Sequence, residues 1–256
     1  MSSSPTEPLV RLVAAAHLLP MSSSRYWSFY DRVAAAQLAA WSPTVPSRVL
    51  DLSGGAFHHA AQLAAAGHRV LQVSSEVHLD EPPPAPGVQR VLAAHDELTW
   101  LRDASLDAIL VESQVLSRCL ATEVTVEHLV RALRPGGRLL LIVDSLLLGL
   151  ARLADQGRWA ELADVPAADC VLVPDEHGIL RRCFGPQELR ELLVDAGLEV
   201  DWVRPRSVLS VSAVERALAI EDPAALRSLV RTELALAREH EGESTGHYLV
   251  ASARRA

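Results

Sequence analysis

Residues 48–57 read RVLDLSGGAF, a short apolar run that ends in Asp51-Leu52 and passes into a turn with two adjacent glycines. The next segment, 58–67, is rich in alanine and ends in Gly67, where a glycine commonly closes a helix. A strand, a glycine turn and a helix in this order are typical of the first unit of an α/β sheet. Because ligands of such sheets bind beyond the carboxyl ends of the strands, this turn is the first candidate site.

The rest of the chain alternates short apolar runs with helical segments. Continuous runs rich in Val and Leu predict parallel strands that are buried on both faces, as in an α/β sheet. Residues 81–87 read EPPPAPG, so the connection 74–87 is expected to join two strands without a helix. Residues 164–183 are expected to be irregular. The expected strands are 48–52, 69–73, 88–94, 107–112, 138–144, 198–204 and 247–253, and the expected helices are 9–19, 25–41, 58–67, 123–133, 146–163, 186–196, 211–220 and 223–240.

The composition excludes several classes of function. Lys plus Arg is 24 against 32 for Asp plus Glu, and a formal net charge of -8 argues against a general nucleic-acid binder. Cys119, Cys170 and Cys183 are far apart, so neither a disulfide framework nor a metal site is predicted, and a cytoplasmic location is favoured. The longest apolar stretch, 139–150, is shorter than the roughly 20 residues of a membrane helix, which argues against a membrane protein.

Taken together, these elements resemble a class I S-adenosylmethionine-dependent methyltransferase from about Tyr26 to the last strand. RVLDLSGGAF stands where that family has its glycine-rich turn, and GHRVLQVSSE and LDAILVES resemble its second and fourth strands. The more specific matches are LVRALRPGGRLLLIVDS, which resembles the helix, turn and fifth strand, and CFGPQELRELLVDAGLEVDWVR, which resembles the later helix and sixth strand. GHYLVASARR resembles the terminal antiparallel strand.

The resemblance implies an α/β, Rossmann-like sheet of seven strands in the order 3-2-1-4-5-7-6. The last strand is then antiparallel, and helices cover both faces. It also implies an N-terminal helical cap, 1–44, that forms a lid on the active site. The α/β domain would follow at 45–256, with a substrate-side excursion at about 146–183.

The resemblance further implies that S-adenosylmethionine lies across the ends of the first, second and fourth strands. Asp51 and the glycine turn would flank the methionine portion, residues 74–76 would meet the ribose, and 94–96 the adenine. Glu112 would lie at the edge of the methyl donor and the substrate. The expected cofactor-binding residues are Asp51, Ser53, Gly54, Gly55, Ser74, Ser75, Glu76, Asp96 and Glu112.

Four positions depart from the family pattern. Ser53 replaces the first glycine of the motif, and Phe57 replaces the last, where its side chain would crowd the turn. Ser74 stands in place of the ribose-binding acid, and Ala94 in place of the acid at the adenine edge. Because a carboxylate normally accepts charge-assisted hydrogen bonds from both ribose hydroxyls, its loss without replacement would weaken binding by about 10- to 1,000-fold.

No catalytic triad is visible, and methyl transfer requires none, since alignment of donor and acceptor provides much of the acceleration. An acceptor that loses a proton needs a base, and the candidates are Glu112, His58 and His177. For Glu112 the alternative interpretation is an exposed charge at a strand end. Neighbouring His58 and His59 point to different sides of a helix, so they are not expected to share a metal.

The predicted substrate contacts are Tyr26, Tyr30 and His177. The two tyrosines are four residues apart and share one helix face, and ordinary packing of that helix on the domain is the alternative interpretation. Arg181 and Arg182 could receive an anionic substrate, although a solvated arginine pair is the more common reason for such a pattern.

The leading interpretation is a methyltransferase that acts on a small molecule or a peptide, as a monomer or homodimer. A second one is a protein of the same fold that has lost or repurposed methyl transfer, and now serves as a binding or regulatory scaffold or for another reaction such as a cyclisation. A nicotinamide-dependent oxidoreductase is the weakest interpretation, because the glycine turn lacks the GxGxxG spacing.

Overall fold

The computed structural model describes residues 25–53, 59–75, 83–119, 121–165, 168–175, 178–219, 222 and 224–256. The helix expected at 9–19 lies outside these residues, as does most of the glycine turn.

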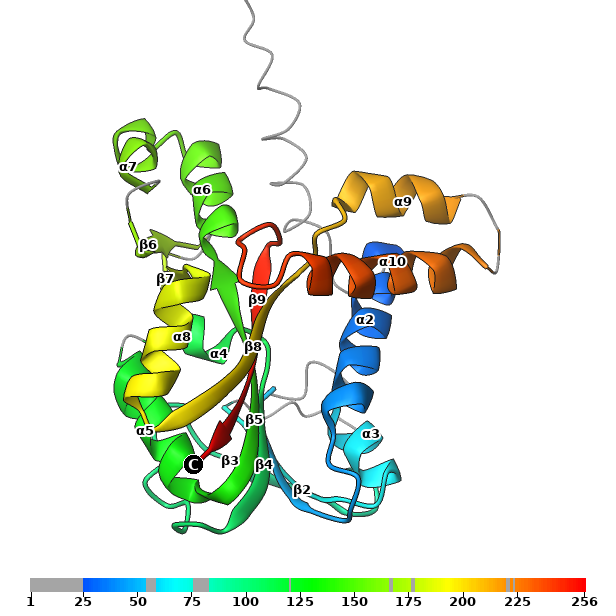
Figure 1. The fold of residues 1–256 in the computed structure, drawn as a ribbon, viewed down its shortest axis with the longest axis vertical. Helices are drawn as coiled ribbons and strands as arrows, with labels where there is room; N and C mark the ends of the chain where they lie inside the picture. The colour runs from blue at the N-terminus through cyan, green and yellow to red at the C-terminus, as the bar shows by residue number, and fades with distance from the viewer. Residues whose placement is uncertain are drawn as a thin grey trace, which may run out of the picture.

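A mixed sheet of nine strands runs through the described part of the molecule (Figure 1). Most of its strands fall on the apolar runs of the sequence. The strands are β1 (Arg48–Asp51), β2 (Arg69–Ser74), β3 (Val88–Leu92), β4 (Leu106–Val111), β5 (Leu133–Ser145), β6 (Cys170–Pro174), β7 (Leu180–Phe184), β8 (Leu198–Arg206) and β9 (Tyr248–Arg255).

The strand pairing has a parallel half and an antiparallel end. Strands β3, β2, β1, β4 and β5 pair in parallel in that order, and β9 pairs antiparallel with both β5 and β8. In Figure 1, β5 and β8 accordingly run upward while β9 runs downward. The path β3-β2-β1-β4-β5-β9-β8 follows the predicted order if β8 and β9 are the sixth and seventh strands.

The predicted number of seven strands was wrong, because residues 164–183 are not simply irregular. Strands β6 and β7 form an antiparallel hairpin, and β7 also pairs in parallel with the end of β5, where Asp144 faces Cys183. Both strands are short, and Arg181 and Arg182 interrupt the apolar pattern of β7. Their sequence therefore carries little of the alternation by which strands are recognised.

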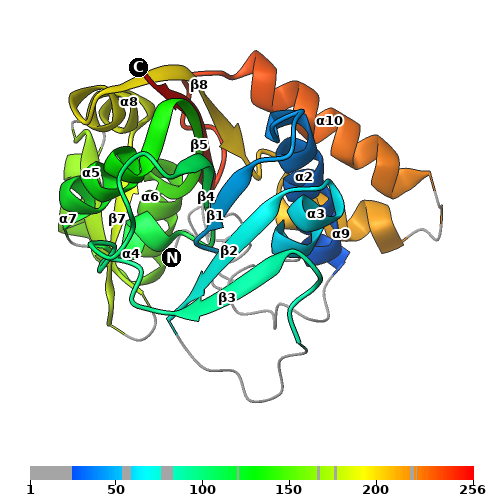
Figure 2. The same cartoon turned by 90° about the horizontal axis from the view of Figure 1, so that it is seen from below.

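Helices cover both faces of the sheet, as predicted. Seen from below in Figure 2, α2, α3, α9 and α10 lie on one side of the sheet, and α4, α5 and α8 lie on the other. The expected helix 146–163 is split in two near Gly157, whose φ of 68° interrupts it. The helices are α2 (Arg25–Trp41), α3 (His59–Ala65), α4 (Val115–Arg118), α5 (Thr122–Ala132), α6 (Leu146–Asp155), α7 (Trp159–Asp164), α8 (Pro186–Asp195), α9 (Val211–Ala219) and α10 (Ala225–Glu239).

Helix α2 belongs to the packed core of the protein. Its apolar residues recur at helical spacing, so that Phe29, Tyr30 and Leu38 form one buried face. The Tyr30 ring lies edge-on against Tyr248 of β9, with 5.7 Å between the ring centroids. This contact ties α2 to the sheet, and a role for residues 1–44 as a lid remains a prediction.

Among the described residues, no helix combines the length and the hydrophobicity needed to span a bilayer.

Candidate active site

The carboxyl ends of the parallel strands bring several acidic residues to one edge of the sheet. Asp51 ends β1, Glu112 follows β4, and Asp144 lies next to the end of β5. All three side chains are buried. Since burying a carboxylate is costly unless it is paired, the partners of each residue decide how it is stabilised.

The two carboxylate oxygens of Asp51 differ in their contacts. One binds the backbone at the start of the glycine turn, and the other accepts no hydrogen bond from a described residue. Its Oδ1 accepts a hydrogen bond from the Ser53 backbone N–H at 2.9 Å. Its Oδ2 is also buried, yet it accepts no hydrogen bond from any residue that the structure describes. Burial raises the pKa of Asp51, and Ser53 and His59 offset this only in part. A buried oxygen without a donor is a position where a ligand N–H can bind.

Glu112 is held from two sides by basic residues. Its Oε2 lies 2.6 Å from Nε2 of His59, the first residue of α3, and its Oε1 pairs with the guanidinium of Arg206 at the end of β8. Arg206 also donates to Gln37 Oε1 at 2.7 Å and to the Tyr30 hydroxyl at 3.1 Å. We call Asp51, His59, Glu112 and Arg206 the β1–β4 cluster.

The charges of the β1–β4 cluster stabilise one another. Burial alone would raise the pKa of Glu112, but Arg206 and His59 lower it to about 2. Burial would lower the pKa of His59, yet the Glu112 carboxylate outweighs it and raises that pKa. Burial raises the pKa of Tyr30 to about 12, so its hydroxyl stays neutral beside Arg206. The cluster therefore joins an ionised Glu112 to Arg206 and His59, with the carboxyl group of Asp51 beside them.

The backbone around this cluster is unusual for residues other than glycine. Ser113 and Gln114, directly after Glu112, have φ values of 56° and 53°, and Ser207, directly after Arg206, has a φ of 63°. Left-handed conformations of this kind cost about 1–3 kcal/mol each and cluster at functional sites. The Ser113 hydroxyl donates to the Ser53 carbonyl oxygen at 2.8 Å, which joins the end of β4 to the turn after β1.

A close approach of two backbones fixes Arg206. Gly246, just before β9, lies so near Arg206 that a Cβ atom there would be 2.9 Å from the Arg206 nitrogen and closer still to its carbonyl oxygen. Only glycine fits this position without a shift. Arg206 and Gln37 were not identified from the sequence as site residues. The available indication was that Arg206 ends an apolar strand.

The predicted site residues fall into four groups. Asp51, Ser53, Ser74 and Glu112 are buried at the carboxyl edge, whereas Ser75 and Asp96 are exposed. The alternative of an exposed Glu112 is wrong. Tyr26 and Tyr30 are both buried at the interface between α2 and the sheet, so packing describes them better than an open substrate surface. Outside the described residues lie Gly54, Gly55, Phe57, His58, Glu76 and His177.

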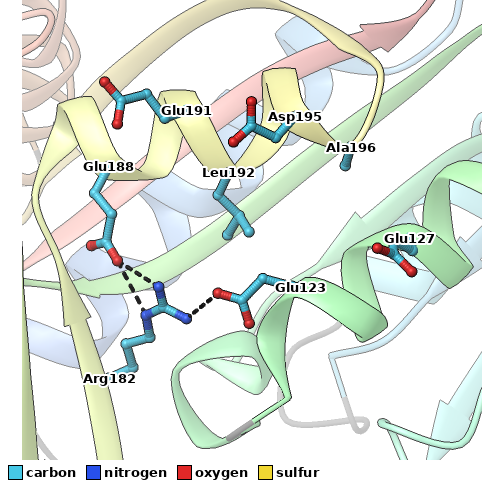
Figure 3. Close-up of a pocket in the computed structure, with 8 residues that line it drawn as sticks. All are labelled: Glu123, Glu127, Arg182, Glu188, Glu191, Leu192, Asp195 and Ala196. Carbon is cyan, nitrogen blue, oxygen red and sulfur yellow. Dashed lines mark hydrogen bonds and ion pairs between the residues drawn. The ribbon is translucent and has the colours of Figure 1, made fainter.

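A separate cavity of about 290 Å³ lies between α5 and α8 (Figure 3). Its lining is acidic, and Arg182 spans it by binding Glu188 at 2.6 Å and Glu123 at 2.7 Å. None of the predicted cofactor-binding residues lines it. In the described part of the chain, no group of three or more His, Cys, Asp or Glu side chains is arranged to hold a metal ion.

No family model and no curated protein sequence matches the chain. Solved structures, however, do resemble it. A 1,6-didemethyltoxoflavin-N1-methyltransferase from Burkholderia thailandensis, solved with 1,6-didemethyltoxoflavin and S-adenosylhomocysteine, is 23% identical with a TM-score of 0.55, over 100% of this chain and 92% of that one. An S-adenosylmethionine-dependent methyltransferase from Mesorhizobium loti is 15% identical with a TM-score of 0.55, over 92% of this chain and 100% of that one. The chain has the class I methyltransferase fold.

The methyltransferase fold is not restricted to methyl transfer. The [4+2]-cyclase SpnF is 16% identical to this chain with a TM-score of 0.56, over 98% of this chain and 93% of that one. Because the fold hosts more than one reaction, the activity depends on the residues of the site.

Proposed function

We propose that the chain binds S-adenosylmethionine at the carboxyl ends of β1, β2 and β4 and transfers its methyl group to a small molecule or a peptide. The methyltransferase fold supports this proposal, and Asp51 carries it. In open α/β sheets, ligands bind beyond the carboxyl ends of the strands. There the Asp51 carboxylate is buried and keeps one oxygen without a donor among the described residues.

The residues present fit the methionine portion of the cofactor better than the ribose. The free oxygen of Asp51 suits the ammonium group, which can donate a charge-assisted hydrogen bond. At the end of β2, Ser74 offers a buried hydroxyl where the family has a carboxylate. A neutral hydroxyl makes weaker hydrogen bonds than a charged acceptor, so we expect a moderate affinity.

When bound, S-adenosylmethionine supplies a methyl group on a positively charged sulfur, and the protein's task is to align the acceptor with it. Glu112 does not fit the role of general base. With a pKa of about 2 and both oxygens in ion pairs, it is a weak proton acceptor at neutral pH. We assign it a positioning role, in which it fixes the end of β4 between α3 and β8.

Calorimetric titration with S-adenosylmethionine and S-adenosylhomocysteine tests this proposal. We expect micromolar binding by the unmodified protein and a loss of about 10- to 100-fold in Asp51→Asn, which removes a charge-assisted contact. Asp201→Asn is the matched control, because Asp201 bonds to Ser252 and Arg254 on the strand pair β8 and β9. Absence of binding at millimolar ligand, with the protein folded, contradicts the proposal.

A repurposed fold is the second candidate, and two observations favour it. Ser74 replaces the ribose-binding acid, and a cyclase is among the structures that resemble this chain. Such a protein would bind S-adenosylhomocysteine weakly or not at all and transfer no methyl group. Incubation with methyl-labelled S-adenosylmethionine and a mixture of small-molecule acceptors separates the two candidates, since labelled product excludes a purely non-catalytic role.

A further inference from the structure

A second buried charge cluster lies at the carboxyl end of β5. The Asp144 side chain has no exposed surface, and its Oδ2 lies 2.7 Å from Nη1 of Arg152 and 3.5 Å from Nη1 of Arg181. The Arg181 Nε also pairs with Asp175 Oδ2 at 3.2 Å. Like Asp51, Asp144 has a buried oxygen, Oδ1, that accepts no hydrogen bond from a described residue.

A third guanidinium, that of Arg118, approaches the same cluster. Arg118 ends α4, and this helix contacts β7, the strand that carries Arg181. The preceding residue, Ser117, accepts a hydrogen bond from the Asp144 backbone N–H at 2.8 Å. Partial burial and the neighbouring Arg181 lower the pKa of Arg118. Arg118 is exposed and forms no ion pair with any carboxylate that the structure describes, so it is the accessible member.

The charges of these described residues do not balance. Arg118, Arg152 and Arg181 bring three positive charges against the two negative charges of Asp144 and Asp175. His247, whose pKa is lowered to about 4 by burial and by Arg152, is neutral at pH 7 and adds no charge. Guanidinium groups that share a partly buried site repel one another unless an anion joins them.

We propose that this β5–β7 cluster, which is Arg118, Arg152, Arg181, Asp144 and Asp175, binds a carboxylate or phosphate group of the methyl acceptor, with Arg118 in direct contact. The inference rests on the proposed methyl transfer. Its place in the sheet supports it, because β5 pairs with β4, and Val111 next to Glu112 faces Leu141. Neighbouring strands are about 4.8 Å apart, so the cluster lies beside the β1–β4 cluster, where the methyl group would be delivered.

The members of the β5–β7 cluster have separate tasks. Arg152 and Arg181 are largely buried and fix the Asp144 carboxylate, which in turn keeps them from moving apart. Arg118 keeps its planar donor fork available, and such a fork binds two oxygens of a carboxylate or phosphate at once. An uncharged acceptor would bring no negative charge to balance the arginines of the described residues.

Protection of Arg118 from phenylglyoxal is the test. The full chain is modified in sodium phosphate, in sodium benzoate or in sodium chloride at equal ionic strength, and peptide mass spectrometry follows each arginine. At about ten times its dissociation constant, an anion should slow modification of Arg118 about tenfold. Arg231, exposed on α10, is the internal reference and should react equally in all three salts. The anion that protects identifies phosphate or carboxylate as the preferred group, and equal rates at Arg118 in all three salts overturn the proposal.

Calorimetry on Arg118→Gln separates this proposal from the proposed function. The protecting anion should bind about 10- to 100-fold more weakly to Arg118→Gln than to Arg231→Gln, since one charge-assisted contact is lost. Titration of the same samples with S-adenosylhomocysteine reports on the cofactor site. If the cofactor binds but the anion has equal affinity for both variants, the anion site is overturned and the proposed function stands. Anion binding without cofactor binding keeps the anion site but overturns its assignment to a methyl acceptor.

Discussion

Two buried charge clusters lie side by side at the carboxyl edge of the sheet, and they differ in how their charges are paired. In the β1–β4 cluster, Glu112 is paired on both oxygens, and two carboxyl groups face two basic side chains. In the β5–β7 cluster, arginines outnumber carboxylates among the described residues, and Arg118 is exposed. Glu112 and its two basic partners hold strands together, whereas surplus charge with an exposed member is available to a ligand.

The two clusters also differ in the sign of the charged group that each leaves available to a ligand. The β1–β4 cluster keeps an anionic oxygen of Asp51 for a cation, and the amino group and sulfur of S-adenosylmethionine are both positive. The β5–β7 cluster keeps a cation for an anion. A positive methyl donor beside an anionic acceptor is a favourable electrostatic arrangement, and it follows from which residues end each strand.

Replacing Arg206 should have the largest effect. Arg206→Met leaves Glu112 charged and buried with only one cation, and we expect a loss of about 3–5 kcal/mol in the free energy of unfolding, measured with urea. Arg204→Met on the same strand is the control, because its partner Glu241 is partly exposed, and it should cost no more than about 1 kcal/mol.

The double variant Glu112→Gln/Arg206→Met sharpens this result. Removal of both charges should recover part of the lost stability, since no unpaired ion is left. A small effect of Arg206→Met alone would show that the β1–β4 cluster is not held by its ion pairs.

Acidification should weaken the β1–β4 cluster next. Since the pKa of Glu112 is about 2 in the folded protein and about 4.3 in an unfolded chain, its stabilisation is complete above about pH 4.3 and is lost as the pH falls toward 2. Urea unfolding at pH 5 and pH 3 should show an extra loss on the order of 1–2 kcal/mol relative to Glu112→Gln. Equal losses in the two proteins would contradict the lowered pKa.

The affinity for S-adenosylhomocysteine should also depend on pH through Asp51. Burial raises the pKa of Asp51 in the free protein, whereas a bound ammonium group favours the ionised form. Binding therefore releases a proton, and the affinity should fall by up to about tenfold per pH unit below that pKa. Calorimetry between pH 8 and pH 5 measures this, with Asp51→Asn expected to show a weaker dependence. Parallel profiles would place the titrating group elsewhere.

The smallest expected effect is that of Arg118 on stability. Arg118→Gln removes repulsion from Arg181 without breaking an ion pair with a described residue, so the free energy of unfolding should change by no more than about 0.5 kcal/mol. Arg152→Gln, which breaks the 2.7 Å contact with buried Asp144, should cost more. A large loss in Arg118→Gln would mean that both clusters are structural.

The sequence predicts the sheet better than it predicts the clusters. The parallel strands are buried on both faces, so their apolar runs stand out, and Asp51 and Glu112 are recognisable because they follow such runs. The β6–β7 hairpin escaped prediction because both strands are short and β7 carries Arg181 and Arg182. Local pattern cannot reveal strands whose burial depends on distant helices.

The partners of the buried acids could not be predicted for a related reason. Arg206 is 94 residues from Glu112 and 169 residues from Gln37 along the chain, and only the folded sheet brings them together. His59 was considered only as a neighbour of His58, yet the start of α3 places it against β4. Such contacts depend on tertiary geometry, and no spacing in the sequence encodes them.

A crystal structure of the protein grown with S-adenosylhomocysteine would show whether Asp51 receives the cofactor. We expect the methionine portion at the end of β1, with its ammonium group within hydrogen-bond distance of Asp51 Oδ2. We also expect the sulfur to face the space between the two clusters. Ligand bound elsewhere, or an Asp51 carboxylate that makes no ligand contact while the ligand is present, would show that Asp51 is not the cofactor-binding acid.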